Sequence, residues 1–176
     1  AISSQVYDAC GIVLAEHKRE MVYSRLARRI RQHKLKNFKE YLDFLEENKE
    51  QEFSEFINAI TTNLTSFFRE PHHFSYLKNT IVPKLLISNA KQKRVRVWSA
   101  GCSTGEEPYT IAMTLSSLFP SDWDVKILAT DLDSNVLAKA QAGTYTAANV
   151  NGLDKSQLKR WFLKSHDGQL YKVKPE

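Results

Sequence analysis

Two short apolar runs, with a glycine turn and a helical pattern between them, constrain the fold of this chain more than any other feature. The runs are "VRVWSA" (residues 95–100) and "VKILATD" (125–131), and the intervening stretch contains "GCSTG" followed by the helix-like "EPYTIAMTLSSLF". Strand, glycine turn, helix and strand in this order make a βαβ unit, which is almost always right-handed and parallel. The sequence therefore predicts an α/β fold with a parallel sheet in this part of the chain.

The helix after the turn opens with two acids, Glu106 and Glu107. A glycine turn that leads into a helix usually binds an anion, because free backbone N–H groups and the helix dipole both favour negative charge. Two carboxylates at this position would repel a phosphate, and the turn from Gly101 to Gly105 matches neither G-x-G-x-x-G nor a P-loop. It favours a nucleoside-like ligand without phosphate at that point, and a positive charge on the ligand would suit it. The alternative on the turn alone is a tight βα turn without a ligand.

The second apolar run ends at Asp131. An acid at the carboxyl end of the strand that follows a glycine turn commonly accepts hydrogen bonds from ribose hydroxyls. Asp133 is a weaker candidate because Asp133 or Ser134 would cap the next predicted helix, "DLDSNVLAKAQAG". Glu107 and Asp131 beside a glycine turn, with no lysine nearby, favour S-adenosylmethionine over NAD or ATP.

The first 80 or so residues are predicted to be helical. Val22, Leu26 and Ile30 recur every four positions between Glu16 and His33. Asn37 is a predicted N-cap, and two later helices carry apolar faces made of Phe53, Phe56, Ile57 and Ile60, and of Phe74, Leu77, Ile81 and Leu85. Towards the C-terminus a short helix, "DKSQLKR", precedes a hairpin whose turn is Asp167-Gly168.

The net charge of +5 is concentrated in one segment. Eight basic residues lie between Glu16 and Lys36, namely Lys18, Arg19, Arg25, Arg28, Arg29, Arg31, Lys34 and Lys36. A solvated charged face is the simplest explanation, and an anionic partner is the functional one. A nucleic-acid-binding module would require aromatic residues interleaved on this face, where Tyr23 is the only candidate.

The segment "TTNLTSFFRE" (61–70) follows one predicted helix and combines polar residues with Arg69. Phe67 and Phe68 could be core residues and Arg69 a surface residue; if the segment lies over the glycine turn, Arg69 could instead bind a ligand carboxylate.

His72 and His73 do not have the spacing of a metal site, so no metal is expected. Only Cys10 and Cys102 are present, which argues against a disulfide framework and fits a reduced, cytoplasmic protein. No apolar run approaches the roughly 18 residues of a membrane span.

Four stretches together resemble the chemotaxis receptor methyltransferases of the CheR type. They are "GIVLAEHKREMVYSRLARRIR", "FINAITTNLTSFFREPHHF", "VRVWSAGCSTGEEPYTIAM" and "ATDLDSNVLAKAQAGTY", in that family's order and across nearly the whole chain. The resemblance implies an N-terminal helical domain (expected at residues 1–75) and a Rossmann-like methyltransferase domain (76–176). It implies that the cofactor S-adenosylmethionine, which leaves as S-adenosylhomocysteine, is bound by Asn63, Thr65, Arg69, Gly101, Glu107 and Asp131.

The function implied by the resemblance is methyl transfer to glutamate carboxylates of methyl-accepting chemotaxis receptors. Arg69 is the residue expected nearest the chemistry, and Arg25, Arg28 and Arg31 are expected to face the anionic receptor. Residues 144–176 resemble the start of an inserted β-subdomain that binds the receptor's C-terminal tail in that family. A non-catalytic S-adenosylmethionine-binding adaptor is the main alternative.

The chain stops at "YKVKPE", where similar proteins continue with the rest of the sheet and pocket. Only the first half of the Rossmann-like domain is therefore expected here, with apolar sheet surface left uncovered. The 176 residues alone are expected to have little or no activity.

Overall fold

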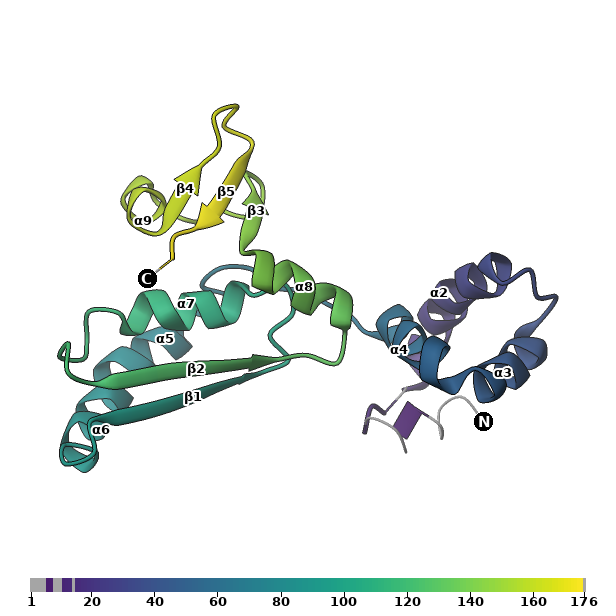
Figure 1. The fold of residues 1–176 in the computed structure, drawn as a ribbon, viewed down its shortest axis with the longest axis horizontal. Coiled ribbons are helices and arrows are strands. Elements are labelled where there is room, and N and C mark those ends of the chain that lie inside the picture. The colour runs from purple at the N-terminus through teal and green to yellow at the C-terminus, as the bar shows by residue number, and fades with distance from the viewer. Residues whose placement is uncertain (1–5, 8–10, 14, 176) are drawn as a thin grey trace. The chain divides into compact units, whose positions relative to one another are not determined.

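The computed structural model describes residues 6–7, 11–13 and 15–175, which form two compact units (Figure 1). The first unit runs to Thr62 and also includes Leu132–Ser134. The second comprises Asn63–Asp131 and the chain from Asn135 onward. The sequence analysis placed residues 63–75 in the N-terminal helical domain. In the structure these residues belong to the second unit. Cys10 lies outside the described residues.

The first unit is helical, as the periodicity predicts. Its elements are η1 (Glu16–Lys18), α2 (Arg19–Gln32), α3 (Phe38–Glu47) and α4 (Lys49–Ile60). Asn37 caps α3 as expected, because its side chain accepts a hydrogen bond of 2.9 Å from the backbone N–H of Glu40. The three α-helices bury a common apolar core made of Val22, Leu26, Ile30, Tyr41, Leu45, Phe56, Ile57 and Ile60.

A buried carboxylate lies against this core. Glu52 of α4 is only 4% exposed, although its sequence position gave no sign of burial. Its two oxygens accept hydrogen bonds from the guanidinium of Arg29, at 2.9 and 2.5 Å, and from the hydroxyl of Tyr41 at 2.8 Å. The ring of His33 lies 3.1 Å from the same carboxylate. These partners replace the water that burial removes, so the acid remains compatible with a packed interior.

The second unit begins with a helical run that is interrupted by a π turn. It consists of α5 (Pro71–Tyr76), η2 (Leu77–Ile81) and α6 (Val82–Ser88). Phe74 and Leu77 pack inward as predicted, but beyond η2 the core contacts come from Val82 and Leu86 instead of Ile81 and Leu85. A π turn adds one residue per turn, which shifts the apolar face by one position. A simple 3.6-residue period therefore mispredicted the far end of this helix.

The predicted βαβ unit is present. Strands β1 (Arg94–Ala100) and β2 (Asp124–Thr130) are parallel, with α7 (Glu106–Leu115) between them in the chain. One face of the strand pair packs on α6 and α7 through Val97, Val125, Ile127, Val82, Ile111 and Leu115. Val95, which has the same parity as Val97, is also buried. Residues with the opposite parity point away from these helices, because side chains alternate along a strand.

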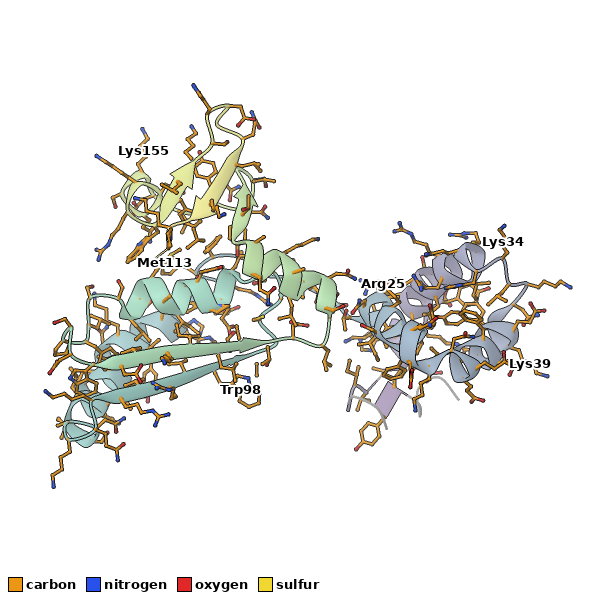
Figure 2. The ribbon with its side chains drawn as sticks, viewed as in Figure 1. Arg25, Lys34, Lys39, Trp98, Met113 and Lys155 are labelled. Atoms are coloured by element: carbon orange, nitrogen blue, oxygen red, sulfur yellow. The ribbon has the colours of Figure 1, made fainter. Side chains whose placement is uncertain are left out.

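The outward face of the strand pair is partly apolar. Trp98 is 68% exposed and Leu128 is 60% exposed, and they are register partners on the two strands. Figure 2 shows Trp98 on the side of the strands away from α7. Both side chains are therefore large apolar groups left in contact with solvent among the described residues.

The chain after β2 forms α8 (Ser134–Ala142) and a small antiparallel sheet with strand order β3-β5-β4. Gly143 follows the last residue of α8 with a φ of +55°, a conformation common at the C-terminal end of a helix. The sheet comprises β3 (Thr144–Thr146), β4 (Phe162–Lys164) and β5 (Leu170–Val173), and α9 (Lys155–Trp161) precedes β4. Residues Asp167 and Gly168 lie in the β4–β5 connection, where Gly168 has a φ of +74°. Met113 of α7 points toward this sheet (Figure 2) and joins a core with Phe67, Tyr145, Val150, Leu153 and Phe162.

Candidate cofactor site

The glycine turn after β1 is held against the end of β2. The backbone N–H groups of Gly101 and Cys102 donate to the carbonyl of Thr130 at 2.8 and 2.9 Å. The N–H of Ser103 donates to Oδ2 of Asp131 at 2.7 Å. These bonds place Asp131, as predicted, beside the turn at the carboxyl end of β2.

The two acids at the start of α7 differ in environment. Glu107 is exposed, and its Oε1 accepts a hydrogen bond of 2.7 Å from the hydroxyl of Ser99, a buried residue of β1. Glu106 is only 2% exposed, and its Oε2 accepts a bond of 2.6 Å from the hydroxyl of Thr104. Both carboxylates lie in the first turn of α7, where the helix dipole stabilises negative charge. Sequence reasoning selected Glu107 and gave Glu106 no separate role.

The Cys102 thiol lies beside the same acids. Burial raises the pKa of this thiol, and the charges of Asp131 and Glu107 raise it further. The thiol therefore stays protonated at neutral pH and is a poor nucleophile.

The segment from Asn63 to Glu70 lies against the glycine turn, which was the condition for a functional interpretation of "TNLTSFFRE". The carbonyl of Asn63 accepts a bond of 3.2 Å from the hydroxyl of Ser103. The N–H of Phe68 donates to Thr110 Oγ1 of α7 at 3.2 Å. Phe67 is buried, whereas Thr65 is half-buried. The structure thus brings Asn63 together with Gly101 and Asp131.

Arg69 is less firmly placed than the turn. Its side chain is exposed, and its NH1 group donates to the carbonyl of Leu64 at 3.2 Å. This contact lies within the segment 63–70, so it orients the guanidinium relative to its own loop. Arg69 is therefore available to a ligand or to solvent.

Backbone strain is concentrated in these two loops. Among the described residues, five that are not glycine have positive φ, and three of them are Phe68, Glu70 and Ser103. Non-glycine residues in this conformation cost on the order of 1–3 kcal/mol and persist where the surroundings hold them. Such strain often marks functional loops, which adds weight to this region as a ligand site.

Gly105 is required by its surroundings as well as by its φ of +98°. A Cβ atom at this position would lie 2.8 Å from the hydroxyl of Tyr145 and 3.0 Å from Cα of Ala140. Tyr145 of β3 was not among the residues selected from the sequence. The local sequence "AGTY" does not indicate that Tyr145 contacts the turn, because its hydrogen-bond partner Thr104 is 41 residues away in the chain.

The three arginines expected to face a receptor lie on α2 but differ in exposure. Arg28 and Arg31 are exposed, as predicted. Arg25 is half-buried, and its NH1 group donates to the carbonyl of Thr61 at the C-terminal end of α4. The sequence did not predict this contact, in which the guanidinium satisfies a carbonyl at the end of a helix.

The two adjacent histidines are both exposed, with ring centroids 4.2 Å apart. His72 Nδ1 lies 3.7 Å from a carboxylate oxygen of Glu70. In the part of the chain that the structure describes, no three histidine, cysteine or acidic side chains are grouped as metal ligands would be. No described helix is long and apolar enough to span a bilayer.

Comparison with known proteins shows matches over both units. Residues 1–61 match the family model of the CheR methyltransferase all-alpha domain, and residues 63–176 match that of the CheR methyltransferase SAM binding domain. A chemotaxis protein methyltransferase of Escherichia coli K12 is 46% identical over 184 residues, covering 99% of the chain and 60% of that protein. Chemotaxis protein methyltransferase 2 of Pseudomonas aeruginosa is 44% identical, covering 93% of the chain and 57% of that protein.

A chemotaxis protein methyltransferase of Borreliella burgdorferi is 42% identical and is covered over 62% of its length. The chain thus spans roughly three fifths of these relatives. The matched domains agree with the helical first unit and with the parallel strand pair of the second. The chain belongs to the CheR family of chemotaxis methyltransferases.

Proposed function

We propose that the complete protein transfers a methyl group from S-adenosylmethionine to glutamate side chains of chemotaxis receptors, in the cytoplasm. The observation that carries the proposal is the glycine turn, which Asp131 holds on one side and the segment from Asn63 contacts on the other. Membership of the CheR family supports the reaction class. The glutamate acceptor follows from the resemblance in sequence and is the part that needs a direct test.

The turn fits the cofactor in shape and in charge. A Cβ atom added to Gly101, which has a φ of +88°, would meet nothing within 4 Å, so there is open space over the turn. Carboxylates of Glu106, Glu107 and Asp131 surround the turn, which favours a cationic ligand over a phosphate. When bound, S-adenosylmethionine supplies a methyl group activated by a positively charged sulfur.

Each side chain then has a defined task. Asp131 would accept hydrogen bonds from ribose hydroxyls, and the bond from Ser103 is compatible with this because a carboxylate accepts several donors. Glu107 is oriented by Ser99 and would attract the cationic end of the ligand. Arg69 can form a planar, bidentate pair with a carboxylate of the cofactor.

The chemistry requires no general base. A glutamate with a pKa of about 4.3 is already ionised at neutral pH. One of its oxygens forms a bond to the methyl carbon while the carbon–sulfur bond breaks, and the electron pair of that bond stays on sulfur. No proton moves in this step. Catalysis would come from holding the glutamate and the methyl group in the reacting geometry, which can lower the activation barrier by roughly 7–11 kcal/mol.

The reaction is tested by incubating the complete protein with methyl-labelled S-adenosylmethionine and receptor. Carboxyl methyl esters release methanol in mild base, whereas N-methyl groups do not. Base-labile label on receptor glutamates would support the proposal. Tight cofactor binding without label transfer would identify the adaptor alternative.

Asp131→Ala is expected to weaken S-adenosylmethionine binding by about tenfold or more in the complete protein. A hydrogen bond to a charged group is worth about 1.5–3 kcal/mol, which corresponds to roughly 10- to 150-fold in affinity. Glu107→Ala should have a smaller effect in the same direction because this side chain is exposed. Titration calorimetry measures both.

Asp124→Ala is the matched control, because Asp124 is the first residue of β2, at the end of the strand opposite to Asp131, and is exposed. Its affinity for the cofactor should equal that of the wild type. If Asp131→Ala and Asp124→Ala bind equally well, the end of β2 is not part of the site.

The exposed basic residues of α2 support the proposal that the substrate is anionic. Arg28 and Arg31 are exposed, whereas Arg29 and Arg25 are engaged within the first unit. Exposed like charges steer an oppositely charged partner and raise the encounter rate. A receptor region rich in glutamate carboxylates is such a partner.

The small sheet is the proposed site for a receptor tail. The segment from Asp154 to Lys174 carries six basic residues and two acids, the basic ones being Lys155, Lys159, Arg160, Lys164, Lys172 and Lys174. Their charge would attract an acidic peptide. The resemblance to the family supports this role.

Arg28→Glu combined with Arg31→Glu should slow receptor methylation most at low salt, with unchanged affinity for S-adenosylmethionine. The slowing should fade as salt rises, because the Debye length falls from about 10 Å at 0.1 M to about 3 Å at 1 M. Initial rates at several salt concentrations measure it. Lys39→Glu with Lys49→Glu changes the net charge equally on exposed residues of α3 and α4. Equal slowing by both pairs would refute a specific docking face.

A further inference from the structure

Tyr145 connects the glycine turn to the small sheet. It lies in β3, opposite Tyr171 of β5, and is only 4% exposed. Its hydroxyl donates a hydrogen bond of 2.8 Å to the carbonyl of Thr104, in the middle of the turn. The close approach of this hydroxyl to Gly105 leaves no room for a side chain there.

The ring of Tyr145 is packed on several sides. It makes an edge contact with Phe67 of the segment 63–70, at 4.9 Å between ring centroids. It also contacts Phe162 of β4 at 6.4 Å and Tyr109 of α7 at 6.2 Å, both nearly perpendicular. Edge-to-face pairs of this kind hold the ring in one orientation. The hydroxyl is therefore presented to Thr104 by residues from the segment 63–70, from α7 and from the small sheet.

The bonded carbonyl lies between two groups of the site. Ser103, which donates its N–H to Asp131, precedes Thr104 in the chain. The Thr104 hydroxyl donates to buried Glu106. Because the peptide unit is planar, fixing the carbonyl of Thr104 also restricts the orientation of the adjoining backbone. Burial raises the pKa of Tyr145, so its hydroxyl remains a donor at physiological pH.

We propose that Tyr145 is a positioning residue for cofactor binding, which holds the glycine turn in its binding conformation through the carbonyl of Thr104. The small sheet and the cofactor turn are thereby mechanically connected through one hydroxyl group. The inference rests on the proposed cofactor site at Gly101 and Asp131. It assigns Tyr145 no contact with the cofactor or with the reacting atoms.

The test compares Tyr145→Phe with Tyr109→Phe in the complete protein. Tyr109 is a matched control because it is half-buried in the same aromatic group and its hydroxyl also donates to a backbone carbonyl, that of Ala140, at 2.8 Å. A net hydrogen bond is worth about 0.5–1.5 kcal/mol, so Tyr145→Phe should raise the Kd for S-adenosylhomocysteine about two- to tenfold. Tyr109→Phe should leave it unchanged.

Two further readouts separate positioning from general stability. Tyr145→Phe should raise the KM for S-adenosylmethionine by the same factor while the KM for receptor stays constant. Hydrogen exchange at the amides of residues 101–105 should accelerate in Tyr145→Phe and not in Tyr109→Phe. A lower melting temperature with unchanged Kd and unchanged exchange in the turn would overturn the proposal.

Non-natural residues at position 145 keep the test decisive if Tyr145→Phe folds poorly. p-Aminophenylalanine restores a donor of similar size, and p-methylphenylalanine fills the same space without one. The amino variant should bind the cofactor nearly as well as the wild type, and the methyl variant should resemble Tyr145→Phe. Equal Kd values for the amino and methyl variants would overturn the proposal.

The Asp131→Ala variant separates failure of this inference from failure of the proposed site. Weak cofactor binding by Asp131→Ala with normal binding by Tyr145→Phe would refute this inference alone. Unchanged cofactor binding by Asp131→Ala would refute the site itself.

Discussion

Glu52→Gln is expected to lower the opening free energy of the first unit by about 3–5 kcal/mol. The substitution keeps the size of the side chain but removes the charge that faces Arg29, whose side chain is only 12% exposed. The guanidinium would then remain largely buried beside Tyr41 and His33, with the more exposed Glu55 as its remaining carboxylate partner. Hydrogen exchange at the amides of α2 and α4 measures the opening free energy of this unit.

Glu55→Gln is the matched control, because Glu55 also pairs with Arg29, at 3.4 Å, but is 44% exposed. An exposed ion pair contributes about 0–1 kcal/mol, so this variant should be close to the wild type. A similar loss of opening free energy in the two variants would show that the burial of Glu52 does not determine how strongly its substitution destabilises the unit.

The effect of Glu52→Gln should depend on pH in a defined direction. Burial by itself raises the pKa of Glu52, but the hydrogen bonds from Arg29 and Tyr41 and the nearby positive charges outweigh it and lower the pKa below its ordinary value of 4.5. A carboxyl with a depressed pKa stabilises the fold above its unfolded-state pKa and loses that contribution as the pH falls through the folded-state value. The difference between wild type and Glu52→Gln should therefore be constant above about pH 5 and shrink below pH 4.5.

Arg69→Lys is expected to reduce kcat/KM for receptor methylation by about tenfold or more in the complete protein. Lysine keeps the charge but cannot reproduce the planar pair of N–H donors that fits a carboxylate. Loss of a charge-assisted bond costs about 1.5–3 kcal/mol. The structure leaves Arg69 exposed on the segment that lies against the glycine turn, where a bound ligand could recruit it.

Arg94→Lys is the control for Arg69→Lys, because Arg94 is exposed at the opposite end of β1 from the turn. Steady-state methylation assays with both variants decide the question. Near-normal activity of Arg69→Lys would mean that Arg69 is an ordinary surface residue.

Much of the local structure was predictable because short-range patterns encode it. The stripe of Val22, Leu26 and Ile30 marked α2, and all three residues are buried. Asn37 marked the start of α3 through a bond that spans only three residues. The alternating apolar runs and the glycine turn identified β1, α7 and β2, with Asp131 at the predicted end of the sheet.

The helix after Pro71 shows where periodicity stops being sufficient. Its π turn at Leu77–Ile81 moves the core contacts to Val82 and Leu86. Single-residue changes in helical phase depend on how the helix fits its neighbours, and a composition pattern does not record them.

The remaining features were decided by tertiary packing. By itself, the sequence determined the helical first part, the βαβ unit, the turn and the acids that surround it. It did not determine that Glu52 is buried against Arg29, that Arg25 binds the end of α4, or that Glu106 is the buried acid of the pair. Nor did it identify Tyr145, whose hydroxyl meets Thr104 across 41 residues of chain. Helix periods and caps depend on neighbours three or four positions away, whereas these contacts form only when distant segments are packed and their polar groups must replace lost water.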